Sequence, residues 1–407
     1  MKVLLLFPPC WHPIMPHLAL PSLTAYLWAK GIQVIQRDLN LEVYDQVLSR
    51  HHLTALVRRL QREERRQRSV PIQSSAQREL LSWAVASGNQ VAGQMEQAKE
   101  IIRSSRFYEA ATGLNALLTL TAGLRLASAP YFPSQIHFTG CDSAYPIDAS
   151  AAILAAVRDR RHNPFHDILS QIALPQIFRE RPDVVGISLT SASQIIAAFT
   201  LAHLIKEAGS KAHITLGGKM ITCWRELFPA RPQLFSLFDS AVVYAGEEPL
   251  YWLLEALDSG KPLSSVPNLI YRDGDRIRCN EVAVSEPAAS LPPPDFHGLP
   301  LRRYLAPELV LPISASRGCY WHRCAFCNVG YRESATYEEK QVEKVREEML
   351  TLAQKWGARH FFFSDEAVSP RILKLLSRRL AESDAHIYWT GAARFEPSLD
   401  AQTLRLM

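Results

Sequence analysis

Three cysteines stand within nine residues of this 407-residue chain, at positions 319, 324 and 327. They belong to the run 316–328, Ser-Arg-Gly-Cys-Tyr-Trp-His-Arg-Cys-Ala-Phe-Cys-Asn, and their spacing is C-x4-C-x2-C. Three thiolates this close can hold three irons of a cubane iron–sulfur cluster, and no fourth cysteine lies nearby for the last iron. An iron left open in this way can bind a substrate or a cofactor, which a cluster built only for electron transfer does not need.

The same cysteines allow two other interpretations, which we consider weaker. A structural zinc site needs four closed ligands, and the candidate fourth ligand, His322, lies between Cys319 and Cys324, where the local geometry is awkward. A disulfide framework is disfavoured because seven cysteines in 407 residues is a sparse and odd number. The remaining cysteines are scattered without paired spacing, at Cys10, Cys141, Cys223 and Cys279.

This segment resembles the cluster loop of radical S-adenosylmethionine (SAM) enzymes. The commonest loop in that superfamily is C-x3-C-x2-C, and this chain has one extra residue and an aromatic pair, Tyr320 and Trp321, after the first cysteine. That variant resembles a subset of the cobalamin-binding members. The resemblance implies that Cys319, Cys324 and Cys327 hold a [4Fe–4S] cluster whose open iron is chelated by SAM. Reductive cleavage of SAM would then give a 5′-deoxyadenosyl radical.

Composition sets broad limits on the chain. The hydrophobic content of 47% suffices for a large core, and the net charge of +5 is too mild to predict nucleic-acid binding. The basic segment 58–68 is interpreted as a solvated helix face, with nucleic-acid binding as a weak alternative. We find no run of about eighteen apolar residues, so we expect no membrane span. Residues 1–9 are interpreted as a buried strand followed by a turn, not as a signal peptide, and we expect a cytoplasmic protein.

Alternating strand and helix patterns predict an α/β fold that opens with a doubly wound parallel sheet of the Rossmann type. Strands are predicted at 2–7, 32–37, 184–189, 213–216 and 240–244, and helices at 20–30, 194–208 and from Glu248 to Leu257. Residues 42–180 are predicted to form a helical insertion with an irregular middle. Within that middle we expect His137, Cys141 and Asp142 to lie in an ordinary loop.

Small and polar residues follow the strands of this predicted sheet, at the edge where ligands bind in such folds. They are Ser188, Thr190, Gly217, Gly218, Gly246 and Glu247. Placed before the cysteine loop, they resemble the cobalamin-binding domain of cobalamin-dependent radical SAM proteins. The Asp-x-His-x-x-Gly motif of other cobalamin proteins is absent, and Asp38-Leu39-Asn40 stands at the comparable place. The resemblance thus implies cobalamin held without a histidine ligand.

A second unit is predicted after a hairpin at 266–280 that turns at Asp273-Gly274 and a proline-rich linker at 285–308. We therefore divide the chain into a cobalamin-binding-like domain at 1–284, the linker, and a radical SAM core at 309–407. The core is predicted as a (β/α) barrel with strands at 309–314, 360–363 and 387–390 and helices at 337–356 and 370–383. The family barrel has about six such units, so we expect a truncated core, either a fragment or a chain completed by a partner.

Three further residues are candidates for binding SAM. Glu366 and Arg394 follow predicted barrel strands, where chemistry collects in such barrels. A carboxylate can receive the SAM ammonium, and a guanidinium can pair with its carboxylate. Arg394 is equally well explained as a surface ion-pair partner. The resemblance also implies that Phe326 lies beside the adenine of SAM.

These features favour a radical SAM enzyme that cleaves SAM reductively and uses cobalamin to methylate an unactivated carbon. The resemblance implies a small-molecule or peptide substrate and an electron donor such as flavodoxin or ferredoxin. Ring rearrangement or another radical reaction is an alternative outcome. A different class remains open, namely a non-catalytic protein that binds a cluster or a corrinoid without turnover.

Overall fold

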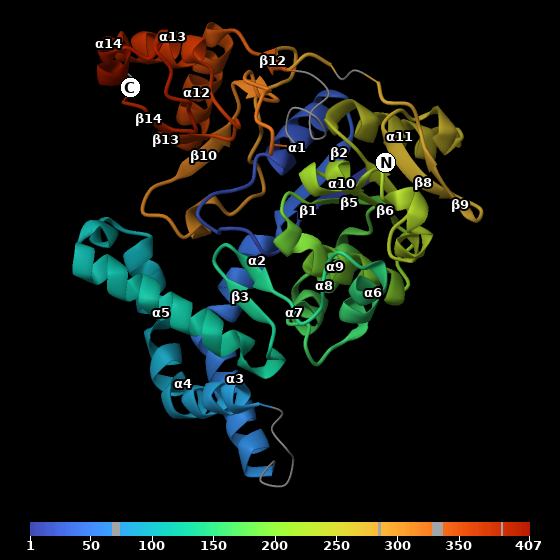
Figure 1. The fold of residues 1–407 in the computed structure, drawn as a ribbon, viewed down its shortest axis with the longest axis vertical. Helices are drawn as coiled ribbons and strands as arrows, with labels where there is room; N and C mark the ends of the chain where they lie inside the picture. Colours follow the sequence, from blue (N-terminus) through green and yellow to red (C-terminus); the bar gives the residue numbers. More distant parts are fainter. Residues whose placement is uncertain (67–73, 284–285, 328–336, 384–385) are drawn as a thin grey trace.

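The computed structural model of the chain describes residues 1–66, 74–283, 286–327, 337–383 and 386–407. Two parallel sheets organise it, one near each end of the chain (Figure 1). The predicted α/β class is therefore confirmed. In the parts of the chain that the structure describes, no helix combines the length and apolar character needed to cross a bilayer.

The larger sheet has seven strands in the order β2-β1-β5-β6-β7-β8-β9. The first five run parallel, and β8 and β9 add an antiparallel hairpin at one edge. The strands are β1 (Lys2–Phe7), β2 (Gln33–Asp38), β5 (Val184–Ser188), β6 (His213–Gly217), β7 (Ser240–Val242), β8 (Leu269–Asp273) and β9 (Arg276–Cys279). The hairpin turns at Gly274-Asp275, one residue later than the predicted Asp273-Gly274, because Asp273 still pairs with Arg276. Gly274 has the positive φ that such a turn requires.

Helices cover both faces of this sheet, as the continuous apolar run of β1 predicts. Along β1, Val3 and Leu5 pack with helices α1 (Ala19–Ala29) and α11 (Glu247–Ser259). Leu4 and Leu6 point to the opposite face and pack in the cluster that contains α9 (Ile195–Glu207). The period of two along a strand thus divides one sequence run between two cores.

The segment between β2 and β5 is mostly helical, as expected. It contains α2 (Leu39–Val47), α3 (Arg50–Arg66), α4 (Ser75–Ile102), α5 (Ala110–Ser128), α6 (Ser150–Arg158), α7 (Phe165–Ile172) and α8 (Leu174–Glu180). The expected irregular middle contains a short hairpin of β3 (Gln135–His137) and β4 (Gly140–Asp142), so the predicted plain loop is wrong. His137 Nε2 and Asp142 Oδ2 lie 2.8 Å apart across it. The basic segment 58–68 continues α3 as far as Arg66, and its remainder lies outside the described residues.

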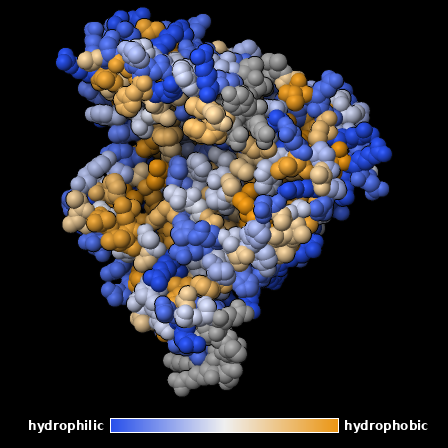
Figure 2. Space-filling view, in the orientation of Figure 1, coloured by the Kyte–Doolittle hydropathy of each residue, from blue (hydrophilic) through white to orange (hydrophobic). Residues whose placement is uncertain are grey.

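Helix α5 leaves part of its apolar surface exposed. Leu114 and Leu118 are 58% and 57% exposed, and Leu117 is 39% exposed. Figure 2 shows an apolar area over α5, at the end of the helix that projects from the rest of the molecule in Figure 1.

The smaller sheet has the parallel order β10-β13-β14. Its strands are β10 (Val310–Ile313), β13 (His360–Phe363) and β14 (Tyr388–Thr390), and its helices are α12 (Val342–Trp356), α13 (Pro370–Ala381) and α14 (Ala401–Leu406). Helix α12 ends at Gly357, which adopts a φ of +69° and closes the last turn.

One boundary of this unit differs from the prediction. The helix expected from Tyr337 begins at Val342 instead, because Glu338–Glu339 forms strand β12. This strand pairs antiparallel with β11 (Ser316–Arg317), directly before the first cysteine of the loop. The backbone amide of Lys340 also donates to Ala315 O at 2.8 Å. A non-local pairing thus takes precedence over local helical periodicity.

Shorter helical turns complete the described chain. Helix α10 (Lys219–Trp224) follows β6, and the 3-10 turns are η2 (Ser105–Tyr108), η3 (Ala129–Tyr131), η4 (Ala192–Gln194), η5 (Phe228–Ala230), η6 (Pro232–Ser236), η7 (Leu263–Ser265) and η8 (Leu301–Arg303).

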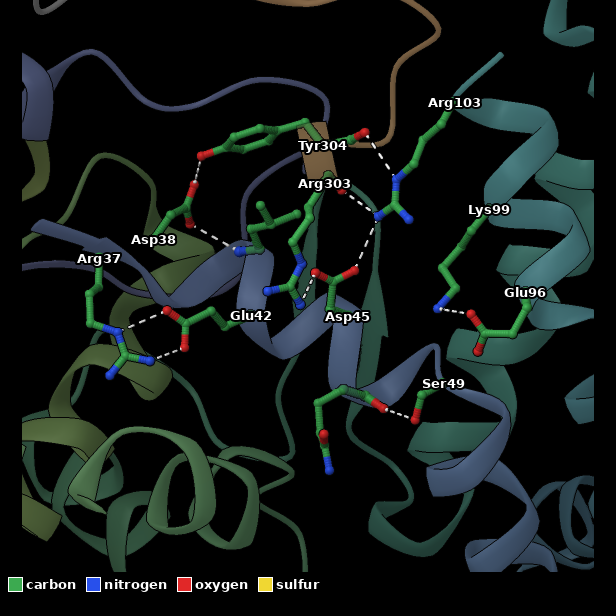
Figure 3. Close-up of polar contacts among 12 residues, drawn as sticks. Arg37, Asp38, Glu42, Asp45, Ser49, Glu96, Lys99, Arg103, Arg303 and Tyr304 are labelled. Atoms are coloured by element: carbon green, nitrogen blue, oxygen red, sulfur yellow. Dashed lines mark hydrogen bonds and ion pairs between the residues drawn. The ribbon is translucent and has the colours of Figure 1, made fainter. Parts of the chain in front are cut away.

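A polar network, which we call the rear junction, ties the segment around η8 to the end of β2 and to the insertion (Figure 3). Tyr304 Oη donates to Asp38 Oδ2 at 2.7 Å, and both residues are buried. Asp45 on α2 pairs with Arg103 at 3.1 Å and with Arg303 at 2.5 Å. Arg103 also donates to Tyr304 O at 3.3 Å and to Arg303 O. Three stretches distant in sequence therefore meet at one point.

Candidate functional site

A cavity of about 690 Å³ lies between the carboxyl ends of the two parallel sheets. Its walls come from the segments that follow β1, β5, β6 and β7 on one side and β10 and β13 on the other. Strand alternation explains the second wall, since Phe361 packs in the core with the helices while its neighbour Phe362 and Pro312 of the paired strand line the cavity. The strand ends of both units thus face one space, where open α/β sheets and barrels bind ligands.

Seven of the residues singled out from the sequence line this cavity. They are Ser188, Thr190, Gly217, Gly218, Gly246, Glu247 and Glu366. The cysteines 319, 324 and 327, together with Phe326 and Arg394, are not among the lining residues. The structure thus brings the strand-end residues of both sheets together, whereas the cysteine loop lies beyond Arg317 at the cavity wall.

Gly218 is the position where this wall depends most strictly on glycine. Its φ is +99°, and a Cβ there would lie 2.3 Å from Leu189 O. The same carbonyl accepts a hydrogen bond from Met220 N at 3.2 Å, and Leu189 N donates to Gly217 O at 2.8 Å. The absence of a side chain lets the β5 and β6 loops cross closely at the cavity wall.

The loop after β1 contributes His12 and His17 to the cavity, which the sequence analysis did not single out. His17 stacks on Phe7 at 4.5 Å, and its Nδ1 accepts from Ala19 N at 3.3 Å. Its Nε2 lies 3.1 Å from Thr190 Oγ1, so a neutral ring donates there. Burial, assisted by the neighbouring His12, lowers the pKa of His17 to about 4, which keeps the ring neutral at pH 7. Two histidines between a strand and its helix were the available sequence signal.

The segment Asp38-Leu39-Asn40, expected at the place of the missing cobalamin motif, is not among the lining residues. Asp38 caps α2 by accepting from Leu41 N at 3.0 Å. Burial raises the pKa of Asp38 to about 6, and the hydrogen bond from Tyr304 opposes that rise. Asn40 Oδ1 accepts from Trp11 N at 2.9 Å and so supports the cavity loop from behind. The loop after β1 faces the cavity instead.

Two ion pairs connect the two walls, and we call them the cavity junction. Lys219 Nζ, after β6, lies 3.0 Å from Glu366 Oε1, after β13. Arg317, in the approach to the cysteine loop, lies 2.7 Å from Glu247. Glu366 and Glu247, both expected to contact cofactors, therefore each face a cation of the opposite wall.

Asp365, just after β13, holds the two residues that lead into the cysteine loop, Ala315 and Ser316. It is 7% exposed and accepts from Ala315 N at 2.9 Å and from Ser316 Oγ at 2.6 Å. Burial raises the pKa of Asp365, although the Ser316 hydroxyl and the backbone amides partly offset this. Lys340 and Glu348 form a buried ion pair at 2.8 Å beside it. The start of the loop is therefore anchored to β13.

The three cysteines of the loop are half-buried free thiols. The loop bends at Gly318, with a φ of +76°, and at His322, with a φ of +56°. His322 Nδ1 lies 3.2 Å from Cys319 O, and Cys327 N donates to Cys324 O at 3.1 Å. Within the described ranges, no three side chains of His, Cys, Asp or Glu are grouped so that they could hold a metal ion.

The donor set of the loop nevertheless has the chemistry of a cluster site. The three cysteines form no disulfide, and free cysteine thiolates are the usual ligands of iron–sulfur clusters. In a cubane cluster each thiolate binds a different iron. The cluster stays a prediction that rests on type and spacing. Phe326 is 90% exposed, so its predicted contact with adenine also stays a prediction.

Arg394 lies against the cysteine loop. Its guanidinium carbon is 3.2 Å from the centre of the Trp321 ring, and its Nη1 is 3.6 Å from Glu396. Tyr320 Oη donates to the same carboxylate at 2.6 Å. Burial and this hydrogen bond raise the pKa of Tyr320 to about 12, so the phenol remains a donor at neutral pH. The ion-pair alternative for Arg394 is thus realised in this structure.

Comparison with known proteins relates this geometry to enzymes. No protein-family model matches the chain. A curated relative is the uncharacterized methyltransferase PH0819 of Pyrococcus horikoshii, which is 27% identical over 218 residues. The match covers 52% of this chain and 46% of the relative, so this chain spans about half the relative's length.

Solved structures give a likeness over the whole chain. The radical SAM methyltransferase TsrM of Kitasatospora setae, with tryptophan substrate and a SAM analog bound, superposes with a TM-score of 0.53 at 14% identity. TsrM with cobalamin and a [4Fe–4S] cluster bound gives a TM-score of 0.51. Each comparison covers 100% of this chain and 57% of the TsrM chain. The chain therefore has the fold of a radical SAM methyltransferase that binds cobalamin, as the cysteine loop and the strand-end glycines predict.

Proposed function

We propose that this chain is a radical SAM enzyme that methylates an unactivated carbon with the help of cobalamin. In this proposal Cys319, Cys324 and Cys327 hold a [4Fe–4S] cluster. The observation that carries the proposal is the cavity shared by the strand ends of both sheets, because it gives a corrinoid and SAM one common space. The C-x4-C-x2-C spacing and the fold likeness to TsrM support it.

When bound, the cluster would supply the electron that cleaves SAM to a 5′-deoxyadenosyl radical, and cobalamin would supply the methyl group. The chain's own residues bind and orient. Gly217 adds no side chain to the wall beside the β6 loop, and Gly218 lets the β5 and β6 loops cross closely there. Ser188, Thr190, Gly246 and Glu247 extend that wall. The neutral His17 presents an N–H to Thr190 and adds no charge to the cavity.

Glu366 is the proposed partner of the SAM ammonium. It pairs with Lys219 at 3.0 Å, and the side chains of Glu366 and Lys219 are 45% and 39% exposed. Pairs this exposed are worth little, so an incoming ammonium can replace Lys219 at modest cost. Phe326 and Arg394 complete the proposed SAM contacts. The substrate is proposed to be a small molecule or a peptide, and the electron donor a flavodoxin or ferredoxin.

The proposed division of labour follows the domain boundaries expected from the sequence. Residues 1–284 would hold the corrinoid, with 42–180 as an insertion, and residues 309–407 would hold the cluster and SAM. Residues 285–308 would link the two. This chain covers only 57% of the length of TsrM. The methyltransferase activity of this chain is therefore proposed and does not follow from the likeness.

The test is anaerobic reconstitution with iron, sulfide and hydroxocobalamin, followed by incubation with SAM and dithionite. The proposal predicts about four irons per chain, corrinoid retained through gel filtration, and 5′-deoxyadenosine in the product mixture. Cys324→Ala should lose the product, whereas Cys279→Ala, which removes an exposed cysteine of β9, should keep it. If the chain retains corrinoid but forms no 5′-deoxyadenosine, the enzyme proposal fails, and the chain is a corrinoid-binding protein without turnover.

A further inference from the structure

The cysteine loop is fastened to the segment that follows β14 by four side chains, which we call the aromatic latch. They are Tyr320 and Trp321 of the loop and Arg394 and Glu396 after β14. Tyr320 Oη donates to Glu396 Oε1 at 2.6 Å across 76 positions of sequence, and the Arg394 guanidinium lies 3.2 Å from the Trp321 ring centre. Arg394 and Glu396 close the set with an ion pair of 3.6 Å.

The chemistry of each contact makes the latch more than a chance surface encounter. A phenol that donates to a carboxylate forms a charge-assisted hydrogen bond, and a guanidinium over an indole is a favourable cation–π pair. Arg323 adds a second guanidinium at 5.4 Å from the Trp321 ring. Arg394 and Glu396 are 32% and 22% exposed, so solvent screens these contacts only in part.

The latch also accounts for the unusual length of the loop. Tyr320 and Trp321 lie between Cys319 and Cys324, the interval that carries one residue more than the common C-x3-C form. The positive φ of Gly318 and of His322 brackets the aromatic pair. These two bends free the pair to leave the path of the loop and contact the β14 segment, while the thiols remain uncommitted.

We propose that the aromatic latch positions Cys319 for cluster binding, and that Arg394 and Arg323 place positive charge beside the cluster. Tyr320, Trp321, Arg394 and Glu396 are positioning residues in this account. A guanidinium stacked on an indole keeps its in-plane N–H donors, so Arg394 can hold the latch and also pair with a SAM carboxylate as proposed above. The part of the proposal that concerns the cluster rests on the proposed function.

The first arm of the test uses the protein without a cluster. Iodoacetamide alkylation of Cys319 is followed by peptide mass spectrometry, with the exposed Cys279 of β9 as internal reference. Trp321→Leu and Glu396→Gln should each raise the alkylation rate of Cys319 about fivefold relative to Cys279, because the freed loop samples open conformations. Glu382→Gln, which removes the partner of an exposed ion pair on the neighbouring helix end, should leave the rate unchanged. Equal rates in all four proteins would overturn the latch.

The second arm separates stacking from charge in the reconstituted protein. Arg394→Met should make the midpoint potential of the cluster more negative, because the added electron loses a nearby positive charge. Arg394→Lys keeps that charge but loses the planar guanidinium, so it should restore the potential and still show fast alkylation. An unchanged potential in Arg394→Met would overturn the electrostatic role. If the unsubstituted chain assembles no cluster, the proposed function fails, and the alkylation arm alone decides the latch.

Discussion

The linker and the smaller unit contact the larger unit at two junctions that differ in burial. At the rear junction, the Tyr304 hydroxyl and the Asp38 carboxylate bond to one another inside the protein, each under 5% exposed. At the cavity junction, Lys219 and Glu366 pair while 39% and 45% exposed. Since an unpaired buried charge costs far more than an exposed one, the rear junction should hold the linker firmly on the larger unit, and the cavity junction should exchange its partners for ligands.

The largest expected effect concerns the carboxyl group of Asp38. Its pKa is raised from 3.8 to about 6 in the folded chain, so the folded state holds its proton more tightly than the unfolded state. This contribution to stability is present below pH 4 and is lost as pH rises to about 6, and it amounts to about 3 kcal/mol. Asp38→Asn removes the charge: its one amide oxygen can accept from Leu41 N, and its amide N–H can donate to the Tyr304 hydroxyl oxygen.

The unfolding free energy of Asp38→Asn should therefore rise relative to the unsubstituted chain by up to about 3 kcal/mol between pH 4 and pH 7. Urea unfolding of both proteins at each pH measures this difference, and the subtraction removes groups that titrate in both, such as His17. A difference that stays constant with pH would show that Asp38 is not buried in the way described.

A somewhat smaller effect is expected from the other partner in the same bond. Tyr304→Phe leaves the buried carboxylate of Asp38 with one donor fewer, and should lower the unfolding free energy at pH 7 by about 2 kcal/mol. Thermal or urea unfolding measures the loss, with Tyr108→Phe as a control on a 65% exposed tyrosine. Equal stability of the two variants would remove the distinction between the junctions.

Within the cavity junction, the pair of Arg317 and Glu247 is more buried than the pair of Lys219 and Glu366. Arg317 is 23% exposed, pairs with Glu247 at 2.7 Å and donates to Glu286 O at 3.1 Å. We expect Arg317→Met to lower the unfolding free energy by about 1 kcal/mol, since the pair is only partly screened. A loss as large as that of Tyr304→Phe would mean that the cavity junction is as rigid as the rear one.

The smallest effect on stability is expected for Lys219→Met. The exposed pair with Glu366 should contribute less than about 0.5 kcal/mol to the unfolding free energy. In reconstituted protein, however, the uncontested Glu366 should bind SAM about threefold more tightly, as measured by equilibrium dialysis. Weaker SAM binding would indicate that Lys219 contacts SAM itself and does not compete with it.

Local pattern predicted much of this fold, and non-local pairing explains most of what it missed. Strand β1 matches its predicted range because its apolar run is buried on both faces, and β13 matches because its alternate residues Phe361 and Phe363 are buried in the core. Strand β12 was missed because its two residues pair with Ser316–Arg317, and a two-residue strand has no periodicity of its own. The alternation of strands and helices along the chain sufficed to predict the parallel sheets.

In the candidate site, too, some features could be predicted from the sequence and others depend on the tertiary fold. Glycines at strand ends, such as Gly218, are visible in sequence, and the structure places them on the cavity wall. The partners of His17, namely Phe7 and Thr190, and the pairing of Glu366 with Lys219 across 147 positions are products of the tertiary fold. The sequence therefore predicted which residues lie at strand ends, but not that the ends of both sheets share one cavity, nor which charges face one another there.

The most direct test of the central claim is an electron paramagnetic resonance spectrum of the reconstituted and reduced chain, recorded with and without SAM. A [4Fe–4S] signal whose g values shift when SAM is added, and which is absent in Cys324→Ala, is the result that an open iron at the cysteine loop predicts. A cluster signal that is unchanged by SAM would contradict the claim, because all four irons would then be closed to the cofactor.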